Sequence, residues 1–85
     1  MMAEPEFVLY HRLADEQSAA ARRWIVQRGL KAWVDFQNVD ADAAGEFAAR
    51  GGRRVPALWD GSALHEGFAA IRRVLSSIIR SEEQP

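Results

Sequence analysis

Arg53-Arg54-Val55-Pro56-Ala57-Leu58-Trp59-Asp60-Gly61 carries the most structural information in this chain, because a proline stands inside a strand-like run that ends at a turn. Proline cannot donate a backbone hydrogen bond to a sheet, so it belongs at the start, at a bulge or at the edge of a strand. A cis X-Pro bond is the commonest reason for a strand to keep it there. Asp-Gly between apolar residues is the strongest short hairpin signal, because both turn residues adopt positive φ. The stretch predicts a strand over 55–59, a tight turn at Asp60-Gly61 and a short strand over 62–65.

The composition limits what the chain can do. Its 85 residues suffice for one domain with one core, so we assign residues 1–85 to a single domain with its core over about 6–80 and a polar tail over 81–85. The formal net charge of -1 predicts no general attraction to nucleic acid or to an anionic membrane. The chain has no cysteine, which excludes disulfides, thiolate metal sites and thiol redox chemistry. Its start is acidic and polar and it has no long apolar run, so we expect a cytoplasmic protein.

The first half of the chain predicts a strand, a helix and a second strand. Residues 6–11 form a near-continuous apolar run, which is typical of a strand that is covered on both faces. Asp15 is placed to cap a helix that runs to Arg28, and Gly29 is placed to end it in the left-handed conformation. A second strand is expected over 32–37.

The second half predicts a short helix, the hairpin and a final helix. Asp40 is placed to cap a helix over 43–48, in which Gly45 costs about 1 kcal/mol relative to alanine. Apolar residues at three- and four-residue spacing predict the last helix over 68–79. The order β-α-β-α-β-β-α with a right-handed crossover predicts an α/β fold. We expect a mixed four-stranded sheet flanked by three helices, the first and last of them on one face.

This order of elements, together with several local segments, resembles a known family. The chain is similar to the short bacterial glutaredoxin-like proteins of the thioredoxin-like superfamily, over about residues 7–79. The segments that carry the resemblance are Leu9-Tyr10-His11-Arg12, Val39-Asp40-Ala41-Asp42, Arg54-Val55-Pro56-Ala57-Leu58 with Asp60-Gly61, and Gly67-Phe68. The resemblance implies a thioredoxin-like, more narrowly a glutaredoxin-like, fold.

The resemblance also implies a site at the start of the first helix, where such proteins carry a Cys-x-x-Cys motif. Asp15 and Ser18 stand at the two cysteine positions, so thiol–disulfide exchange is excluded. Serine does not replace the nucleophile, because its hydroxyl stays protonated near neutral pH without an adjacent base. Asp15 is interpreted first as a helix cap, and its charge opposes anionic ligands. Ser18 is either an ordinary first-turn serine or, as in some glutathione transferases of this fold, a donor to a bound thiolate.

A second implied feature is a groove beside the Val55-Pro56 loop. In such proteins the backbone beside the proline binds an extended ligand by strand addition, which requires no particular side chains. The alternative is that Pro56 only holds the shape of an inherited loop. Four arginines are expected at the same rim, either to favour a carboxylate or phosphate or as solvated surface residues: Arg12, Arg50, Arg53 and Arg54.

The sequence at the start of the last helix argues against tight binding of glutathione. Glutaredoxins use a Gly-Gly step and an aspartate there, whereas this chain has Gly67 followed by Phe68. His11 and His65 are isolated from other metal ligands and predict no metal site. The three tryptophans are expected to enlarge the core, with only the last a candidate exposed contact: Trp24, Trp33 and Trp59.

These patterns favour a non-redox glutaredoxin-like domain that binds a protein or peptide segment and is not an enzyme. The predicted groove comprises Arg12, Arg54, Val55, Pro56, Gly67 and Phe68, and it requires that neither Leu13 nor Trp59 fill it. The alternative is a cysteine-independent, glutathione-binding or transferase-like protein that uses Ser18, and a third possibility is a role in dimerisation. We expect no nucleic-acid, membrane or metal partner and no required cofactor.

Overall fold

A computed structural model describes the backbone of residues 7–83 and the side chains of residues 7–78. Its elements follow the predicted order. They are β1 (Phe7–His11), α1 (Glu16–Gln27), the 3₁₀ turn η1 (Lys31–Trp33), β2 (Val34–Asn38), α2 (Ala44–Ala49), β3 (Ala57–Trp59), β4 (Leu64–Glu66) and α3 (Phe68–Glu83).

The four strands form one mixed sheet in the order β2-β1-β3-β4. β1 pairs in parallel with β2, where Leu9 lies opposite Phe36, and antiparallel with β3, where Leu9 lies opposite Leu58. The third pair, β3 with β4, is antiparallel. β1 is thus central and covered on both faces, which explains its near-continuous apolar sequence.

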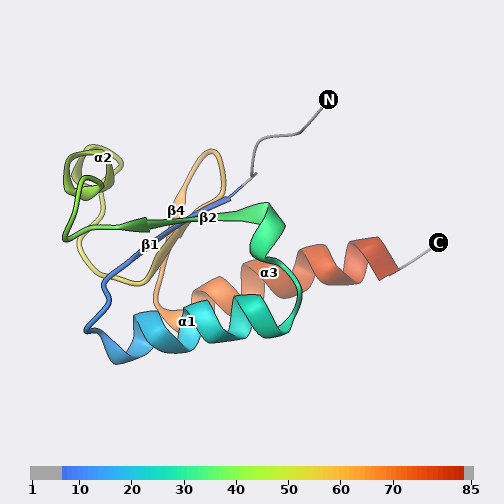
Figure 1. The fold of residues 1–85 in the computed structure, drawn as a ribbon. Coiled ribbons are helices and arrows are strands. Elements are labelled where there is room, and N and C mark those ends of the chain that lie inside the picture. The colour runs from blue at the N-terminus through green and yellow to red at the C-terminus, as the bar shows by residue number, and fades with distance from the viewer. Residues whose placement is uncertain (1–6, 84–85) are drawn as a thin grey trace.

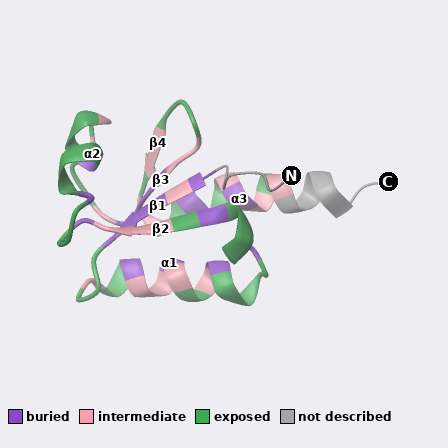
Figure 2. Ribbon diagram, turned by 45° about the horizontal axis from the view of Figure 1, so that its top comes forward, coloured by how far each residue is buried: buried purple, intermediate pink, exposed green. Residues whose placement is uncertain are grey.

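Helices cover both faces of the sheet. α1 and α3 lie side by side against one face, and α2 lies on the other (Figure 1). Figure 2 shows the buried positions on the strands and on the inward sides of the helices, with the exposed positions outside. The larger core cluster lies between the sheet and the α1–α3 pair and comprises Phe7, Leu9, Ala21, Ile25, Leu30, Val34, Leu58, Ile71 and Leu75.

A smaller cluster lies between the sheet and α2. Successive strand residues point to opposite faces, so Leu9 enters the larger cluster and Tyr10 the smaller one. Full burial of an aliphatic or aromatic side chain contributes about 1.5–3 kcal/mol, and both clusters therefore stabilise the sheet. The buried members of the smaller cluster are Tyr10, Val39, Ala43, Phe47 and Ala57.

Local signals explain where α1 begins and ends. The Asp15 carboxylate accepts a hydrogen bond from the Ser18 backbone N–H at 2.8 Å, as expected of an N-cap. The inward stripe contains the fully buried Ala21 and Ile25. Gly29 follows the helix with φ of +72°, a conformation that glycine adopts without strain.

The hairpin differs from the predicted one. β3 begins at Ala57, one residue after the proline that cannot donate to the ladder. The last bridged pair is Trp59 with Leu64, so residues 60–63 form the loop in place of a two-residue turn. Within the described residues only glycines have positive φ, and Asp60 is therefore not in a type I′ turn. Its carboxylate instead accepts the backbone N–H groups of Ser62 and Ala63, both at 2.8 Å, and this stabilises the longer loop.

Other boundaries are also corrected. α2 begins after Ala43 without a side-chain cap, because the Asp40 carboxylate pairs with Arg12 at 2.9 Å and does not reach the helix. The chain forms η1 before β2, and Trp33 in this turn is 38% exposed and outside the core. α3 continues to Glu83, so residues 81–83 are helical where a polar tail was expected, and residues 84–85 lie outside the described part.

Candidate functional site

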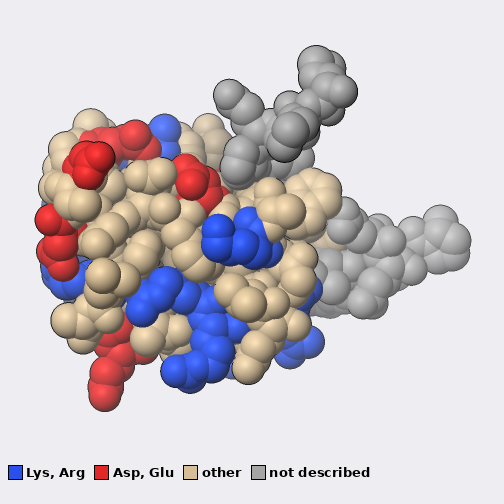
Figure 3. Space-filling model, viewed as in Figure 1, with Lys and Arg blue, Asp and Glu red and all other residues tan. Residues whose placement is uncertain are grey.

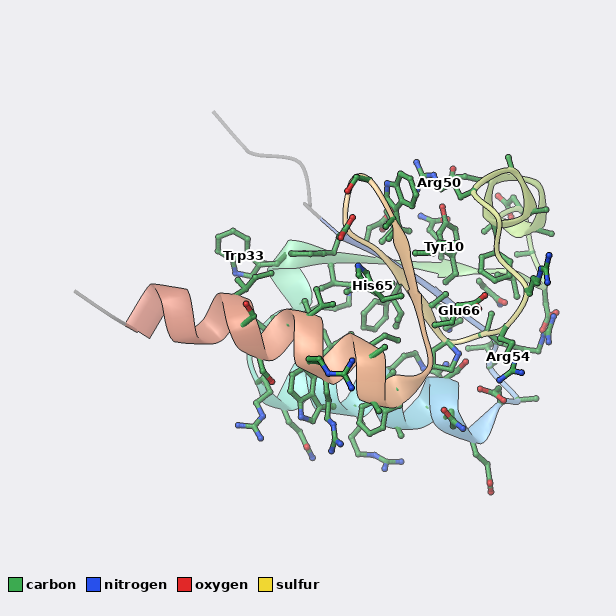
Figure 4. The ribbon with its side chains drawn as sticks, turned by 180° about the vertical axis from the view of Figure 1, so that it is seen from behind. Tyr10, Trp33, Arg50, Arg54, His65 and Glu66 are labelled. Atoms are coloured by element: carbon green, nitrogen blue, oxygen red, sulfur yellow. The ribbon has the colours of Figure 1, made fainter. Side chains whose placement is uncertain are left out.

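A pocket of about 240 Å³ lies between the first turn of α1, the loop before β3 and the junction of β4 with α3. We call it the Val55 groove. Arg54 and Glu66 lie at this end of the molecule, near the start of α3 (Figure 4). The lining residues are Gln17, Arg54, Val55, Glu66 and Gly67.

The loop before β3 is tied to β4 on both sides of Val55. The Glu66 carboxylate accepts hydrogen bonds from the backbone N–H groups of Arg53 and Arg54, at 2.9 and 3.0 Å. On the other side of Val55, the Pro56 carbonyl accepts from the Gly67 N–H at 2.9 Å, and the Val55–Pro56 peptide bond is cis. The loop is therefore held in position by contacts that do not use the Val55 backbone.

The charge of Glu66 is stabilised by these contacts. Hydrogen bonds from the Arg53 and Arg54 N–H groups lower the pKa of the Glu66 carboxyl below its usual value, with a smaller contribution from the two guanidinium charges. Glu66 is thus a carboxylate at neutral pH and a fixed part of the groove wall. The sequence pattern does not predict this contact, because Glu66 is far along the chain from Arg53 and Arg54 and meets them only in the folded structure.

The Val55 backbone is unpaired within the described part of the chain. Neither its N–H nor its C=O hydrogen-bonds to any of residues 7–83. A buried backbone group without a partner is unfavourable, so groups left unpaired at a pocket wall must be bound by water or by a ligand. The side chain of Val55 is half-buried and packs against the smaller core cluster, which keeps the backbone at the groove.

Asp15 and Ser18, the two positions predicted to correspond to redox cysteines, have structural roles. Asp15 caps α1, and the Ser18 side chain is fully buried, with its Oγ accepting the Arg12 N–H at 3.2 Å. A buried hydroxyl has no access to a ligand in the groove. Ser18 therefore holds the loop between β1 and α1, and the geometry does not favour a transferase that uses it.

Gln17 contributes a side chain that the sequence does not single out. Its Oε1 atom accepts a hydrogen bond from the Phe68 backbone N–H at 3.4 Å, and this joins the start of α1 to the start of α3. A glutamine in the first turn of a helix carries no sequence signal for such a contact. Of the predicted groove residues, Pro56 is fully buried and does not line the pocket, and Phe68 contributes only this backbone contact.

The structure separates the four arginines that were expected at one rim. Arg12 pairs with Asp40, whereas Arg50 stacks on Trp59 at 4.4 Å beside α2. Figure 4 shows Arg50 near Tyr10 and away from Arg54, which is the arginine that lines the Val55 groove. The cause is the pairing of Arg12 and Arg50 with other side chains, which the sequence does not show.

Two hydrophobic residues that could fill the groove lie elsewhere. Leu13 is 66% exposed and does not line the pocket. Trp59 packs against the smaller core cluster under Arg50, so it is not the exposed contact that the sequence predicts. The groove therefore meets the requirement that both side chains leave it open.

The remaining ionisable groups of interest pair with neighbours. His11 is buried with its Nδ1 atom 2.9 Å from Arg22 Nη1, and burial followed by this positive charge lowers its pKa. Burial and the hydrogen bond to Glu46 raise the pKa of Tyr10 to about 12.

Among the described residues no group of three His, Cys, Asp or Glu side chains can hold a metal ion. In the same part of the chain no helix is both long and apolar enough to cross a membrane.

The solved structures that share this fold include two glutaredoxins. One is the crystal structure of a buckwheat glutaredoxin–glutathione complex, with a TM-score of 0.63 and 14% identity over 85% of this chain and 69% of that chain. The chain has the glutaredoxin fold. The other, oxidized glutaredoxin 2 from Chlamydomonas reinhardtii, has a TM-score of 0.58 and 14% identity over 85% of this chain and 72% of that chain. The sequence matches no protein-family profile and no curated protein sequence.

The comparison confirms the predicted fold. A mixed four-stranded sheet with three helices is what the sequence predicts, and both similar structures are glutaredoxins. This glutaredoxin fold has no cysteine anywhere in its sequence. Thiol–disulfide exchange by a cysteine of this sequence is therefore excluded.

Proposed function

We propose that the protein is a non-redox glutaredoxin-fold domain that binds an extended peptide segment of a partner protein in the Val55 groove. The observation that supports it is the unpaired Val55 backbone, which lies at a pocket between two fixed hydrogen-bonded anchors. A peptide that pairs with this N–H and C=O extends the sheet pattern without the need for a nucleophile. Such binding requires no cysteine.

The charges at the groove give the proposed ligand a preference. Among the described residues, the Arg54 guanidinium has no carboxylate within ion-pair distance, whereas Glu66 is already occupied by two backbone N–H groups. A free guanidinium binds carboxylates with bidentate geometry. We therefore expect a peptide with an acidic side chain or a C-terminal carboxylate next to the residue that pairs with Val55.

Catalysis is the less favoured function. Thiol–disulfide exchange needs a thiol, which the chain lacks, and the buried Ser18 is out of reach of a bound thiolate. The buckwheat glutaredoxin in its complex binds glutathione. Glutathione is itself a short peptide, so it serves as a probe of the groove and separates glutathione recognition from recognition of protein segments.

A display selection with random linear peptides tests the proposal. Enriched peptides should bind the protein saturably, and their affinity should fall roughly fivefold or more in Arg54→Glu, because an attractive charge becomes repulsive. Arg53→Glu is the matched control, since it changes the net charge equally but its side chain does not line the groove. Equal loss of affinity in both variants, or no enriched peptide, would contradict the proposal. Tight binding of reduced glutathione without any enriched peptide would assign the groove to glutathione instead.

A further inference from the structure

A second and larger pocket lies on the outer side of the α1–α3 pair, away from the Val55 groove. It measures about 440 Å³. We call it the arginine groove, and its lining residues are Trp24, Arg28, Ala69, Arg72, Arg73 and Ser76. Much of the basic surface in Figure 3 lies over these helices, whereas the acidic side chains gather mainly around α2.

The arginine groove concentrates positive charge without neutralising it. Three of its six lining residues are arginines, none is acidic, and none of the three forms an ion pair with a described carboxylate. Guanidinium groups this close repel one another and raise the local potential, which attracts an anion. The other charged side chains of the described residues nearly balance one another, so the positive charge of the groove is a local feature.

Aromatic rings hold two of these arginines in place. The Arg28 guanidinium lies 5.4 Å from the centroid of the Trp24 ring, and that of Arg72 lies 5.0 Å from the centroid of Phe68. Stacking on a ring contributes about 0.5–1 kcal/mol at exposed sites and leaves the edge of the guanidinium free for a carboxylate. Two of the three charges are thus positioned before any ligand arrives.

We infer that the arginine groove binds an acidic segment of a partner protein, with carboxylates on the three arginines and an apolar side chain against Trp24 and Ala69. A pocket of this volume holds a few side chains and not a long polyanion. Charge complementarity and the apolar part of the lining therefore favour a short acidic peptide.

The probe for this inference is a short fluorescein-labelled peptide of glutamates around one phenylalanine, followed by fluorescence anisotropy. The comparison probes are the same peptide with glutamine in place of glutamate and an oligothymidylate of similar length. The acidic peptide should bind saturably at low salt and weaken as salt rises. Arg73→Glu should raise its Kd roughly five- to tenfold, and Arg53→Glu should change it by less than about twofold. Both arginines are exposed, and neither side chain forms a hydrogen bond or an ion pair with a described residue.

Three outcomes would overturn the inference. Equal weakening by Arg73→Glu and Arg53→Glu would assign the binding to net charge and not to the groove. Tighter binding of the oligothymidylate than of the acidic peptide would assign the groove to nucleic acid. Absence of saturable binding by the acidic peptide at low salt would show that the arginines are solvated surface residues. Because the two pockets share no lining residue, a selective effect of Arg73→Glu reports on the arginine groove and not on the Val55 groove.

Discussion

Gly52 lies against the ring of Phe47, and we predict that Gly52→Ala destabilises the protein by about 2–3 kcal/mol. A Cβ atom at this position would overlap the Cδ1, Cε1 and Cζ atoms of the ring. Phe47 is a buried member of the smaller core cluster and packs against Tyr10, with ring centroids 5.1 Å apart. An added methyl group in a packed cluster costs about 1–3 kcal/mol, and displacement of the ring from the cluster adds to that cost.

Gly45→Ala is the matched control, because it makes the same chemical change within α2. A Cβ atom there meets nothing within 4 Å, and the residue is exposed in the helix. Alanine should stabilise the protein by about 0.5 kcal/mol through its better helix propensity. The measurement is urea unfolding followed by circular dichroism. For a domain of this size the Gly52 variant should also melt about 8–20 °C lower.

Comparing the two variants distinguishes a steric overlap with the Phe47 ring from a general effect of a Gly→Ala substitution in this region. If Gly52→Ala were as stable as the parent protein, the ring of Phe47 would not lie where the structure places it. If both variants were destabilised equally, the effect would come from α2 in general and not from the ring contact. Either result would refute the argument from the overlap.

Three further predictions concern single polar residues. Asp15→Ala removes the N-cap of α1 and should lower the free energy of unfolding by about 1 kcal/mol in a urea titration. Burial and then the nearby positive charge of Arg22 lower the pKa of His11 in the folded protein. Below about pH 6.5 the unfolded chain therefore binds a proton that the folded chain does not, and the free energy of unfolding should fall from pH 7 to pH 5. His11→Gln should flatten this part of the stability profile. Asp60→Ala removes the acceptor of the hairpin loop and should cost about 1–2 kcal/mol at pH 7. The hydrogen bond from His65 and then those from the loop N–H groups lower the pKa of Asp60, so its contribution is present above about pH 4 and lost below it.

Each of these predictions has a result that contradicts it. An Asp15→Ala variant as stable as Asp15→Asn would show that the side chain does not cap the helix. An unchanged slope between pH 7 and pH 5 in His11→Gln would assign the pH dependence to other groups. A constant difference between the parent and Asp60→Ala down to pH 3 would show that the carboxylate charge is not what stabilises the loop.

The elements with strong local signals could be predicted from the sequence. β1 is recognisable because both of its faces are buried, and α1 because Asp15 and Gly29 mark its two ends. The periodic apolar residues of α3 specify its inward face in the same way. These signals act within a few residues of one another, so no knowledge of the tertiary structure is needed.

The errors arise where a side chain has more than one possible partner. Asp40 has a residue type that is typical of an N-cap, but Arg12 lies close in space and pairs with it instead. Asp60-Gly61 matches a two-residue turn, but the Asp60 carboxylate binds two N–H groups of a longer loop. Choices of this kind depend on distances between residues that are far apart or on small differences between turn types, which sequence patterns do not specify.

The candidate site also combines a segment that could be predicted from the sequence with contacts that could not. The segment from Arg54 to Pro56 could be predicted to line a groove only through the resemblance to glutaredoxin-like proteins, since the proline by itself indicates no more than the start or edge of a strand. The contribution of Gln17 and Glu66 could not, since it follows from the meeting of α1, β4 and the loop in space. The sequence does not predict the arginine groove either, because its residues come from α1 and α3, which are separated in sequence by α2 and three of the four strands.

An amide NMR titration with a peptide selected against the protein tests the proposed function most directly. The account predicts a saturable downfield shift of the Val55 amide and slower hydrogen exchange at that amide, because the peptide backbone supplies its missing hydrogen-bond partner. Gly67 should shift with it, whereas Arg73 in the arginine groove should not. A peptide that binds while the Val55 amide keeps its shift and its exchange rate would contradict the account.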